Sequence, residues 1–413
     1  MTTAAAITRE ECRTRLATIA GAERVVSTGE TVTVAASDVE QIAEILRFAN
    51  SNGIAVTPCG SGTKQSWGNA VEAGILLDLS RMNKLREHAW QDMTCTVEAG
   101  CTWTVMQAEL AHHGQMVALD PLWPERATVG GIVAANDGGC FRLKYGSLRD
   151  LIIGMTVVLA DGTIAKTGGK VVKNVAGYDL HKLMTGSFGT LGVISEVNFR
   201  LHPLESNTQT WTAVAPEPFQ FEHALRGLLD SQLTPSSVQL RLSETECELD
   251  IKISAPAECM DEHSAKLSKI CGVMELSPSD ETVWQARQEL HDTANAVVLK
   301  ISTLPNDLCL LCSELQDWSA KKGMEIAVVA QANGLVTAAL KTAPDAAIAL
   351  IHHLRERLRN AGGSVVALQV PSPLRSTLDV WGCESNALPL MKEIKRRFDP
   401  NRILNPGRFV GNI

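Results

Sequence analysis

The chain has 413 residues, more than one hydrophobic core usually spans, so two or more domains are expected. Hydrophobic residues make up 45% and charged residues 20%, which is typical of a globular fold and not of a disordered chain. The net charge of −8 argues against a nucleic-acid-binding surface, because phosphate contacts need clustered Lys and Arg side chains.

Membrane spans and secretion are not expected. The longest apolar runs, such as residues 151–160, are too short to cross a bilayer. The N-terminal stretch MTTAAAITREECR lacks the basic and apolar regions of a secretory signal peptide. The eleven cysteines are odd in number and scattered, which favours reduced thiols over a disulfide framework. Together these features predict a cytoplasmic protein.

Cys309 and Cys312 form a CLLC pair. An iron–sulfur cluster usually needs four thiolates, and the other cysteines are not suitably grouped. We therefore interpret the pair as small apolar residues on the buried face of a helix.

The first third of the chain alternates helical and extended patterns, bounded by glycine turns. This rhythm predicts a mixed sheet with helices on it. The expected helices are residues 38–53 and 104–114, and the expected strands are residues 54–60, 74–83, 94–103 and 116–121.

From residue 128 the sequence becomes rich in glycine, and further elements follow. A hairpin is expected over residues 151–169 with Asp161-Gly162 at its turn, followed by a strand over 193–201. The expected elements after residue 206 are a hairpin over 238–255, a helix over 347–363 and a basic C-terminal helix with a Pro- and Gly-containing tail.

Three glycine-containing segments are candidate ligand sites. The first runs from a predicted strand into Gly60, Ser61, Gly62 and Thr63, where small residues let backbone N–H groups converge on an anion. It matches neither a Walker loop nor a Rossmann fingerprint, and alone it is as typical of a surface turn.

The second and third segments are equally non-specific by themselves. DPLWPERATVGGIVAANDGG, at 120–139, leaves a side-chain-poor surface that suits either a flat cofactor or tight helix–sheet packing. KNVAGYDLHKLMTGSFGTLG, at 173–192, places glycines at every third position from Gly186 to Gly192.

The order and spacing of the three segments resemble the FAD-binding family of vanillyl-alcohol oxidase (PCMH) type, especially its glycolate oxidase and D-lactate dehydrogenase branch. The motifs that carry the resemblance are CGSGT at 59–63, ATVGG at 127–131, GSFGTLGVI at 186–194 and the closing FDPNRILNPG at 398–407. The resemblance implies an α+β fold. An FAD-binding domain over 1–205 would contain two α/β subdomains split near residue 95. An α+β cap would span 206–385, and a tail over 386–413 would return to the FAD domain.

The resemblance also implies a role for each matching residue. Gly60, Ser61, Gly62 and Thr63 would cradle the FAD pyrophosphate. The flavin and ribityl side would be lined by Pro121, Thr128, Gly130, Gly131 and Ala134, and continued by Gly138 and Gly139. Gly192 and Ile194 would lie at the adenosine end, and Asn405 near the isoalloxazine.

Covalent FAD attachment is not expected. Many members of the family attach FAD through a histidine of the first loop, and here no histidine precedes His88. The expectation is non-covalent FAD and no metal ion.

The catalytic residues are not assigned. Catalytic members of the branch carry histidines in the cap, but the nearest counterpart here, residues 328–340, contains none. The nearby His352 and His353 are adjacent on a predicted helix and point in different directions. Phe188 stands where related chains often carry Glu, which we interpret as packing.

Within the family, the stretch KNVAGYDLHKLMTGSFGTLGVISE, at 173–196, resembles the FAD-binding E subunits of glycolate oxidase. This implies a catalytic flavin D subunit and an iron–sulfur F subunit as partners, with membrane contact only peripheral and through them. One alternative is a self-sufficient 2-hydroxy-acid dehydrogenase whose base is His202, His291, Tyr145 or Lys173. Another is a scaffold with a degenerate flavin site.

Overall fold

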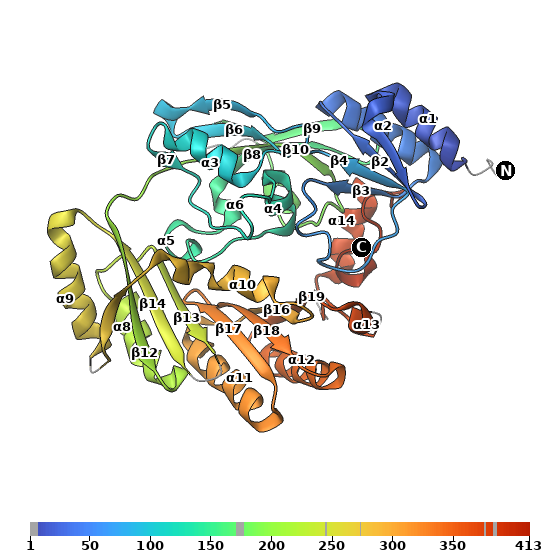
Figure 1. Ribbon diagram of the computed structural model, residues 1–413. Coiled ribbons are helices and arrows are strands. Elements are labelled where there is room, and N and C mark those ends of the chain that lie inside the picture. Colours follow the sequence, from blue (N-terminus) through green and yellow to red (C-terminus); the bar gives the residue numbers. More distant parts are fainter. Residues whose placement is uncertain (1–6, 171–176, 244–245, 273, 376, 383–385) are drawn as a thin grey trace. The chain divides into compact units, whose positions relative to one another are not determined.

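The computed structural model describes residues 7–170, 177–243, 246–272, 274–375, 377–382 and 386–413. It divides into two compact units (Figure 1). The first contains Met1–Gly138, Ser147–Leu204 and Glu384–Ile413, and the second contains Gly139–Gly146 and Glu205–Cys383. The sequence predicted domain boundaries at 205/206, between the FAD domain and the cap, and at 385/386, between the cap and the tail. It did not separate residues 139–146, which belong to the second unit here.

The first unit begins with a small sheet and two helices. Its described strands are β1 (Val25–Thr28), β2 (Thr31–Ala35), β3 (Val56–Cys59) and β4 (Ile75–Asp78), in the order β1-β2-β4-β3. β2, β4 and β3 run parallel, and β1 pairs antiparallel with β2. Helices α1 (Arg9–Ala20) and α2 (Val39–Asn52) share a core with this sheet.

Helix α2 confirms the prediction for residues 38–53, and its two ends show why. The Asp38 carboxylate accepts a hydrogen bond from the Gln41 backbone N–H at 2.8 Å, which caps the N-terminus. Gly53, with a φ of 63°, takes the left-handed conformation that ends the helix.

The second sheet of this unit is antiparallel. Its order among the described strands is β5-β6-β10-β8-β9. The bounds are β5 (Leu85–Ala89), β6 (Thr94–Glu98), β8 (Ile152–Val158), β9 (Ile164–Gly168) and β10 (Val193–Arg200). β8 and β9 confirm the predicted hairpin. The sheet starts at Leu85, so the subdomain split predicted near residue 95 lies too late, because polar β5 (LREHA) gives no alternating apolar pattern.

The strand predicted over residues 116–121 is wrong for most of its length. Only β7 (Gln115–Met116) is extended, paired with β11 (His202–Pro203). Beyond it, the side-chain amide of Gln107 bonds both the N–H and the carbonyl of Val117, each at 2.9 Å. A side chain thus takes the place of a strand partner, and the apolar residues Val117–Leu119 form a buried loop.

Short helices complete this unit. They are α3 (Trp103–Ala111), α4 (Val129–Ala135), α6 (Leu148–Leu151) and α7 (Leu180–Met184). The C-terminal helix α14 (Leu388–Phe398) confirms the predicted basic helix, and the tail after it runs beside β3, where Leu404 forms a parallel bridge with Val56 (Figure 1).

The second unit is built on one large antiparallel sheet. Its order among the described strands is β15-β12-β14-β13-β17-β18-β16-β19. The first four in chain order are β12 (Thr208–Ala215), β13 (Ser237–Leu242), β14 (Cys247–Ser254) and β15 (Leu276–Ser279). The others are β16 (Val297–Ser302), β17 (Glu325–Gln331), β18 (Leu335–Lys341) and β19 (Ser364–Gln369). β13 and β14 confirm the hairpin predicted over 238–255.

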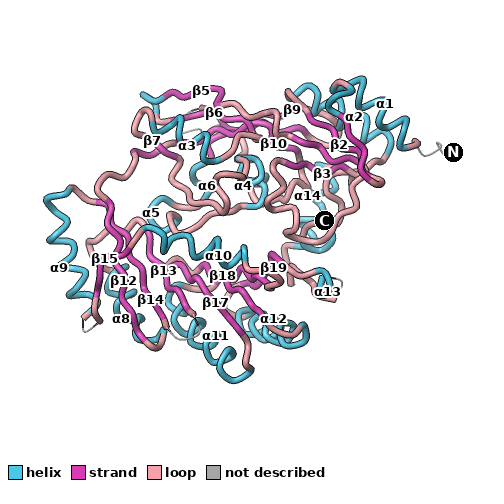
Figure 2. The backbone as a smooth tube through the Cα atoms, in the orientation of Figure 1, coloured by secondary structure: helices cyan, strands magenta, loops and turns pink. Residues whose placement is uncertain are grey.

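Helices pack on both faces of this sheet (Figure 2). One core contains residues of α8 (Glu222–Leu229), α9 (Met260–Cys271), α11 (Leu308–Lys322) and α12 (Pro344–Arg359). Leu290 of α10 (Ala286–Asp292) packs against Val298, Val329 and Ala339 in a separate cluster. The remaining short helices are α5 (Arg142–Tyr145) and α13 (Ser372–Arg375).

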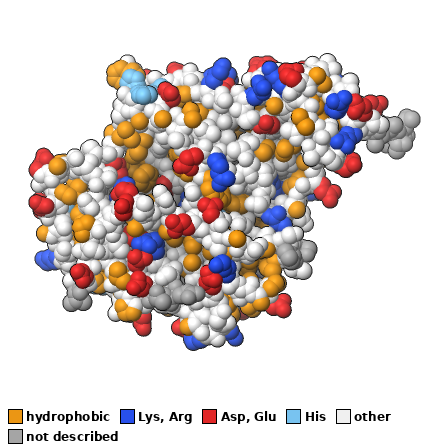
Figure 3. All heavy atoms as spheres, viewed as in Figure 1, with side chains coloured by type: hydrophobic (Ala, Val, Ile, Leu, Met, Phe, Trp, Pro, Cys, Tyr) orange, Lys and Arg blue, Asp and Glu red, His pale blue; other side chains and the backbone are white. Residues whose placement is uncertain are grey.

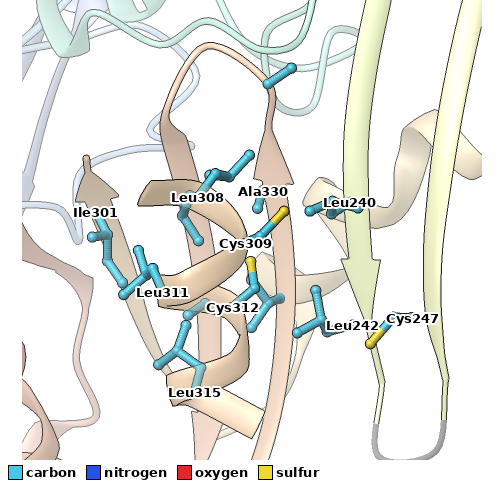
Figure 4. Close-up of a cluster of buried hydrophobic side chains, with 14 of the residues drawn as sticks. Leu240, Leu242, Cys247, Ile301, Leu308, Cys309, Leu311, Cys312, Leu315 and Ala330 are labelled. Carbon is cyan, nitrogen blue, oxygen red and sulfur yellow. The ribbon is translucent and has the colours of Figure 1, made fainter. Parts of the chain in front are cut away.

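The CLLC pair lies inside the larger core, as predicted. Cys309 and Cys312 are buried on α11 among leucines, with Cys247 of β14 close by (Figure 4). Burial raises the pKa of Cys309 to about 12, so its thiol stays protonated. All cysteines in the described chain are free thiols.

Two surface properties bear on partners. On the face drawn in Figure 3, acidic and basic side chains are interspersed. Among the described residues, the helices are too short or too polar to traverse a bilayer.

Candidate cofactor site

A cleft in the first unit brings the glycine-containing segments together. It holds about 710 Å³ of empty space, open solvent included. Its wall comes from the loop after β3, the start of α4, the loop before β10 and the C-terminal tail, all loop or short-helix segments in Figure 2. The lining residues are Pro58, Cys59, Gly60, Ser61, Gly62, Thr63, Lys64, Gln65, Leu79, Ala99, Thr128, Gly130, Gly131, Ala134, Ala135, Phe188, Gly189, Gly192, Ile194, Asn405 and Arg408.

Most residues assigned from the resemblance meet at this cleft. They are Gly60, Ser61, Gly62, Thr63, Thr128, Gly130, Gly131, Ala134, Gly192, Ile194 and Asn405.

Pro121, Gly138 and Gly139 are not among the lining residues. Pro121 is buried in the loop before α4. A Cβ on Gly138 would meet Leu119 at 3.0 Å, so this glycine permits loop packing. Gly139 belongs to the second unit. Pro121 and Gly138 are therefore not brought to the cleft, and Gly139 lies in a different unit from the cleft.

The loop after β3 presents unused backbone donors. Within the described chain, the backbone N–H groups of Gly60, Ser61 and Thr63 donate no hydrogen bond, and that of Gly62 bonds only to the sulfur of Cys59. Gly62 has a φ of 76°, which favours glycine, and a Cβ on Gly60 would lie 2.1 Å from Thr128 Oγ1. Converging unpaired N–H groups form the kind of nest that binds phosphate.

Helix α4 shows that two neighbouring glycines do different things. A Cβ on Gly130 would lie only 2.8 Å from the Cβ of Ala99, the residue directly after β6. This glycine therefore permits close contact between helix and sheet. A Cβ on Gly131 would meet only Thr128 Oγ1, at 3.3 Å. Of the two, Gly131 is the one that leaves open space at the cleft.

The glycines of the third segment are required mainly by backbone conformation and by close contacts within the protein, not by a ligand. Gly186 and Gly189 have positive φ values of 79° and 68°. A Cβ on Gly189 would lie 3.0 Å from the Asn405 side chain, and one on Gly192 would lie 3.3 Å from the Val158 carbonyl. Gly189 and Gly192 line the cleft, whereas Gly186 does not. The part of this segment at 171–176 lies outside the described residues.

Phe188 is a lining residue, and its ring does pack, as expected. It stacks on Phe409 of the tail, with ring centroids 5.8 Å apart. Its φ of 55° is unusual for a residue other than glycine. The neighbouring Asn405 holds it there through a hydrogen bond from Nδ2 to the Phe188 carbonyl, 2.7 Å long.

The tail also fixes the first loop through Arg408, which the sequence did not identify. The Arg408 guanidinium donates to the carbonyls of Lys64, Gln65 and Trp67 and to the side chain of Gln65. The sequence shows a positively charged residue after the Asn-Pro-Gly turn. Its role could not be predicted, because its partners lie more than 300 residues away in sequence.

Lys64 is buried beside the cleft. Its ammonium lies 3.2 Å from the Asp137 carboxylate and near the rings of Trp67 and Trp123. The contact joins the first loop to the end of α4, so Lys64 helps to fix the cleft wall.

Cys59 is not an activated nucleophile. Burial raises the pKa of its thiol, so the thiolate is disfavoured at neutral pH. Among the described residues that line the cleft there is no histidine. Non-covalent FAD remains a prediction.

Three of the four candidate bases of a self-sufficient dehydrogenase, Tyr145, His202 and His291, are not among the lining residues. The Tyr145 hydroxyl donates to Glu205 Oε1 at 2.7 Å, and burial together with that carboxylate raises the pKa of Tyr145. His291 is buried in the second unit, and His202 lies in β11. Lys173 falls outside the described residues. Because its raised pKa keeps the Tyr145 hydroxyl protonated at neutral pH, this side chain is poorly suited to act as a base.

The histidine-free segment 328–340 forms a hairpin of β17 and β18, turning at Asn333-Gly334. His352 and His353 are exposed on α12, and His353 Nε2 pairs with Glu314 at 2.5 Å. Across the described part of the chain, no three His, Cys, Asp or Glu side chains form a candidate metal site.

Comparison with known proteins assigns the class. Residues 31–168 match the family described as FAD binding domain, and residues 383–409 match the C-terminal domain of FAD linked oxidases. The fold resembles that of alkyldihydroxyacetonephosphate synthase, with a TM-score of 0.69 and 18% identity, covering 93% of this chain and 78% of that one.

Two relatives show the range of similarity. The glycolate oxidase subunit GlcD of Bacillus subtilis is 25% identical over 91% of this chain and 88% of its own length. A D-lactate dehydrogenase of Archaeoglobus fulgidus is 40% identical, but over only 42% of this chain and 39% of its own length.

Residues 31–168 therefore form an FAD-binding domain, and the chain is similar to FAD-linked oxidases over nearly its whole length. It is an FAD-dependent oxidoreductase, and FAD is its cofactor.

The cleft fits this cofactor on its own geometry. The nest at 60–63 offers donors to phosphate, and the open side of Gly131 leaves room for a flat ring. The buried Asn405 Oδ1 has no hydrogen-bond partner among the described residues and can accept one from a ligand.

Proposed function

We propose that this chain is the FAD-binding subunit of a glycolate oxidase or dehydrogenase complex. In this proposal it takes part in the oxidation of glycolate to glyoxylate. Electrons would pass between its FAD and the partner subunits, namely a catalytic flavin D subunit and an iron–sulfur F subunit. Any membrane contact would be peripheral and through those partners.

The observation that carries the proposal is an equipped cofactor cleft whose described lining residues include no histidine or carboxylate to serve as a hydroxy-acid base. The cleft has its phosphate nest and its tail, yet Tyr145 is held by Glu205 and the 328–340 hairpin has no histidine. Removing the hydroxyl proton of a 2-hydroxy acid needs a base within hydrogen-bond reach. A flavin site without one is better suited to exchanging electrons than to oxidising the substrate.

The proposal gives each part of the cleft a task. The N–H groups of 60–63 would bind the pyrophosphate, and Thr128, Gly131 and Ala134 would face the flavin and ribityl chain. Gly192 and Ile194 would face the adenosine end, and Asn405 would offer its free Oδ1 to the flavin side. Bound FAD supplies an acceptor that takes up two electrons and can release them singly.

The similarity to a glycolate oxidase subunit over nearly the whole length supports the choice of complex. At 25% identity, that similarity supports the substrate class more than the subunit type.

The test compares the chain alone with the chain co-expressed with candidate D and F subunits. Dye reduction would be measured with glycolate and with D-lactate. We expect no turnover by the FAD-loaded chain alone, co-purification with the partners, and glycolate-dependent reduction of its flavin only in their presence. Full turnover of glycolate or D-lactate by the isolated chain would overturn the proposal in favour of a self-sufficient dehydrogenase.

A further inference from the structure

Helix α14 is anchored by a buried cation. Along Leu388–Phe398, all of it described, Lys395 is the one side chain classed as buried, at 3% exposure. The apolar side chains Ile394 and Phe398 are only partly buried against the core of the first unit. This is unusual, because helices normally dock through an apolar stripe and bury lysine rarely.

All three donors of the Lys395 ammonium are used. Nζ donates to the Thr190 carbonyl at 2.8 Å, to the Leu404 carbonyl at 2.8 Å and to Asp399 Oδ2 at 2.6 Å. Because an ammonium group has three N–H bonds and no acceptor, this set leaves none unsatisfied.

The partner carboxylate is equally well placed. Asp399 is 0% exposed, and it also accepts hydrogen bonds from the backbone N–H groups of Ile403 and Leu404, at 3.0 and 2.8 Å. The pair therefore shapes the turn that starts the tail. A buried pair with complete hydrogen bonding costs less to desolvate than a bare one, and losing one partner leaves a buried charge.

The two carbonyls held by Lys395 belong to the two segments that meet at the cleft. Thr190 lies between Gly189 and Gly192, and Leu404 precedes Asn405. The Asn405–Phe188 hydrogen bond joins the same two segments again, closer to the cleft. A shift of the Lys395 ammonium would therefore move both segments relative to each other.

We propose that Lys395 is a positioning residue for the cofactor, which clamps the glycine segment at 186–192 to the tail at 399–405 so that Asn405 and Phe188 hold their places at the cleft. The inference rests on the proposed cofactor site. Lys395 does not line the cleft, so its effect passes through the two backbone carbonyls.

The test uses Lys395→Met, which keeps the length of the side chain and removes the three donors. Arg396→Met is the matched control, because it removes the same charge from the next residue, whose side chain is 69% exposed. FAD binding would be measured by fluorescence titration of the full-length chain, and amide hydrogen exchange would be followed with and without FAD. We expect the FAD dissociation constant of Lys395→Met to rise about tenfold or more, through faster release. Exchange should rise at 186–192 and 399–405 but not in β13 and β14.

The outcomes separate the inference from the site on which it rests. If the unmodified chain does not bind FAD, the proposed site is wrong. If the chain binds FAD and Lys395→Met binds it equally tightly, the site stands and the positioning role is wrong. Weaker binding accompanied by faster exchange throughout the molecule, or the same loss in Arg396→Met, would also overturn the role. Should Lys395→Met not fold, Asp399→Asn carries the same test, since it keeps an acceptor for the turn and removes the counter-charge.

Discussion

Asn405 reaches across 217 positions of sequence to donate its side-chain N–H to the backbone carbonyl of Phe188, at 2.7 Å. The bond ties the C-terminal tail to the glycine segment before β10. It uses the donor end of the amide and leaves Oδ1 buried without a partner in the described chain. One side chain thus holds a wall of the cleft and offers an acceptor to whatever fills it.

Asn405→Asp tests that arrangement. The carboxylate cannot donate to the Phe188 carbonyl and would face it with a negative charge, so the two segments should separate. We expect FAD affinity to fall by about tenfold or more, measured by fluorescence titration. Asp tolerates the positive φ of 41° at this position better than most residues, which limits backbone strain as a cause. Unchanged affinity would show that the tail does not shape the cofactor site.

The loop at 60–63 is tested by Gly62→Val. At a φ of 76°, a β-branched residue is strained by about 1–2 kcal/mol, and its side chain would stand beside the nest. We expect a protein purified without FAD that FAD addition does not restore.

Gly53→Val is the matched control for this variant. Gly53 has a similar φ of 63°, no atom within 4 Å of its Cβ position, and no place in the cleft lining. It should lose comparable thermal stability and keep FAD. Stoichiometric FAD in Gly62→Val would mean that this loop is not the phosphate site.

Gly130 and Gly131 should respond oppositely to alanine. Gly130→Ala forces a Cβ against Ala99 and should destabilise the apoprotein by about 1–3 kcal/mol. Gly131→Ala meets only a side-chain oxygen at 3.3 Å and adds a better helix former, so the apoprotein should be unaffected or slightly stabilised. Thermal unfolding of both variants without FAD gives the comparison. Equal destabilisation would contradict the assignment of packing to one glycine and open space to the other.

His181 should make the fold sensitive to acid. Burial lowers the pKa of His181 below its ordinary value of 6.5, so between the folded and unfolded pKa values the unfolded chain binds more protons. Above pH 6.5, His181 is neutral in both the folded and the unfolded chain, so it costs the fold nothing. As the pH falls below 6.5, the unfolded chain takes up the proton more readily, and the free energy of unfolding decreases. His181→Leu should narrow the stability difference between about pH 7.5 and about pH 5, as followed by thermal unfolding. An identical acid dependence in both proteins would exclude this histidine as the cause.

Local patterns were enough to predict much of the fold. Helix α2 carries its cap at Asp38 and its stop at Gly53, and the β8–β9 hairpin carries Asp161-Gly162 at its turn. Such elements are encoded by neighbours in sequence. β7 is shorter than predicted because Gln107, outside the strand, bonds Val117 and ends the pairing.

The candidate site was predictable where it depends on glycine and not where it depends on distant partners. The nest at 60–63 and the start of α4 could be located from their small residues. Pro121 and Gly138 stand in the same kind of sequence, but packing directs them elsewhere. Arg408 and Lys395 donate hydrogen bonds to backbone carbonyls far away in sequence. Because every residue has a backbone carbonyl, these acceptors cannot be recognised from residue types.

A titration of the purified, unmodified chain with FAD tests the central claim most directly. Absorption would be recorded during the titration, and again on the supernatant after acid precipitation. We predict saturable, stoichiometric binding with flavin bands near about 375 and about 450 nm, and release of the flavin into the supernatant. No saturable binding would contradict the assignment of the cleft to FAD, and flavin that stayed with the precipitated polypeptide would contradict non-covalent attachment.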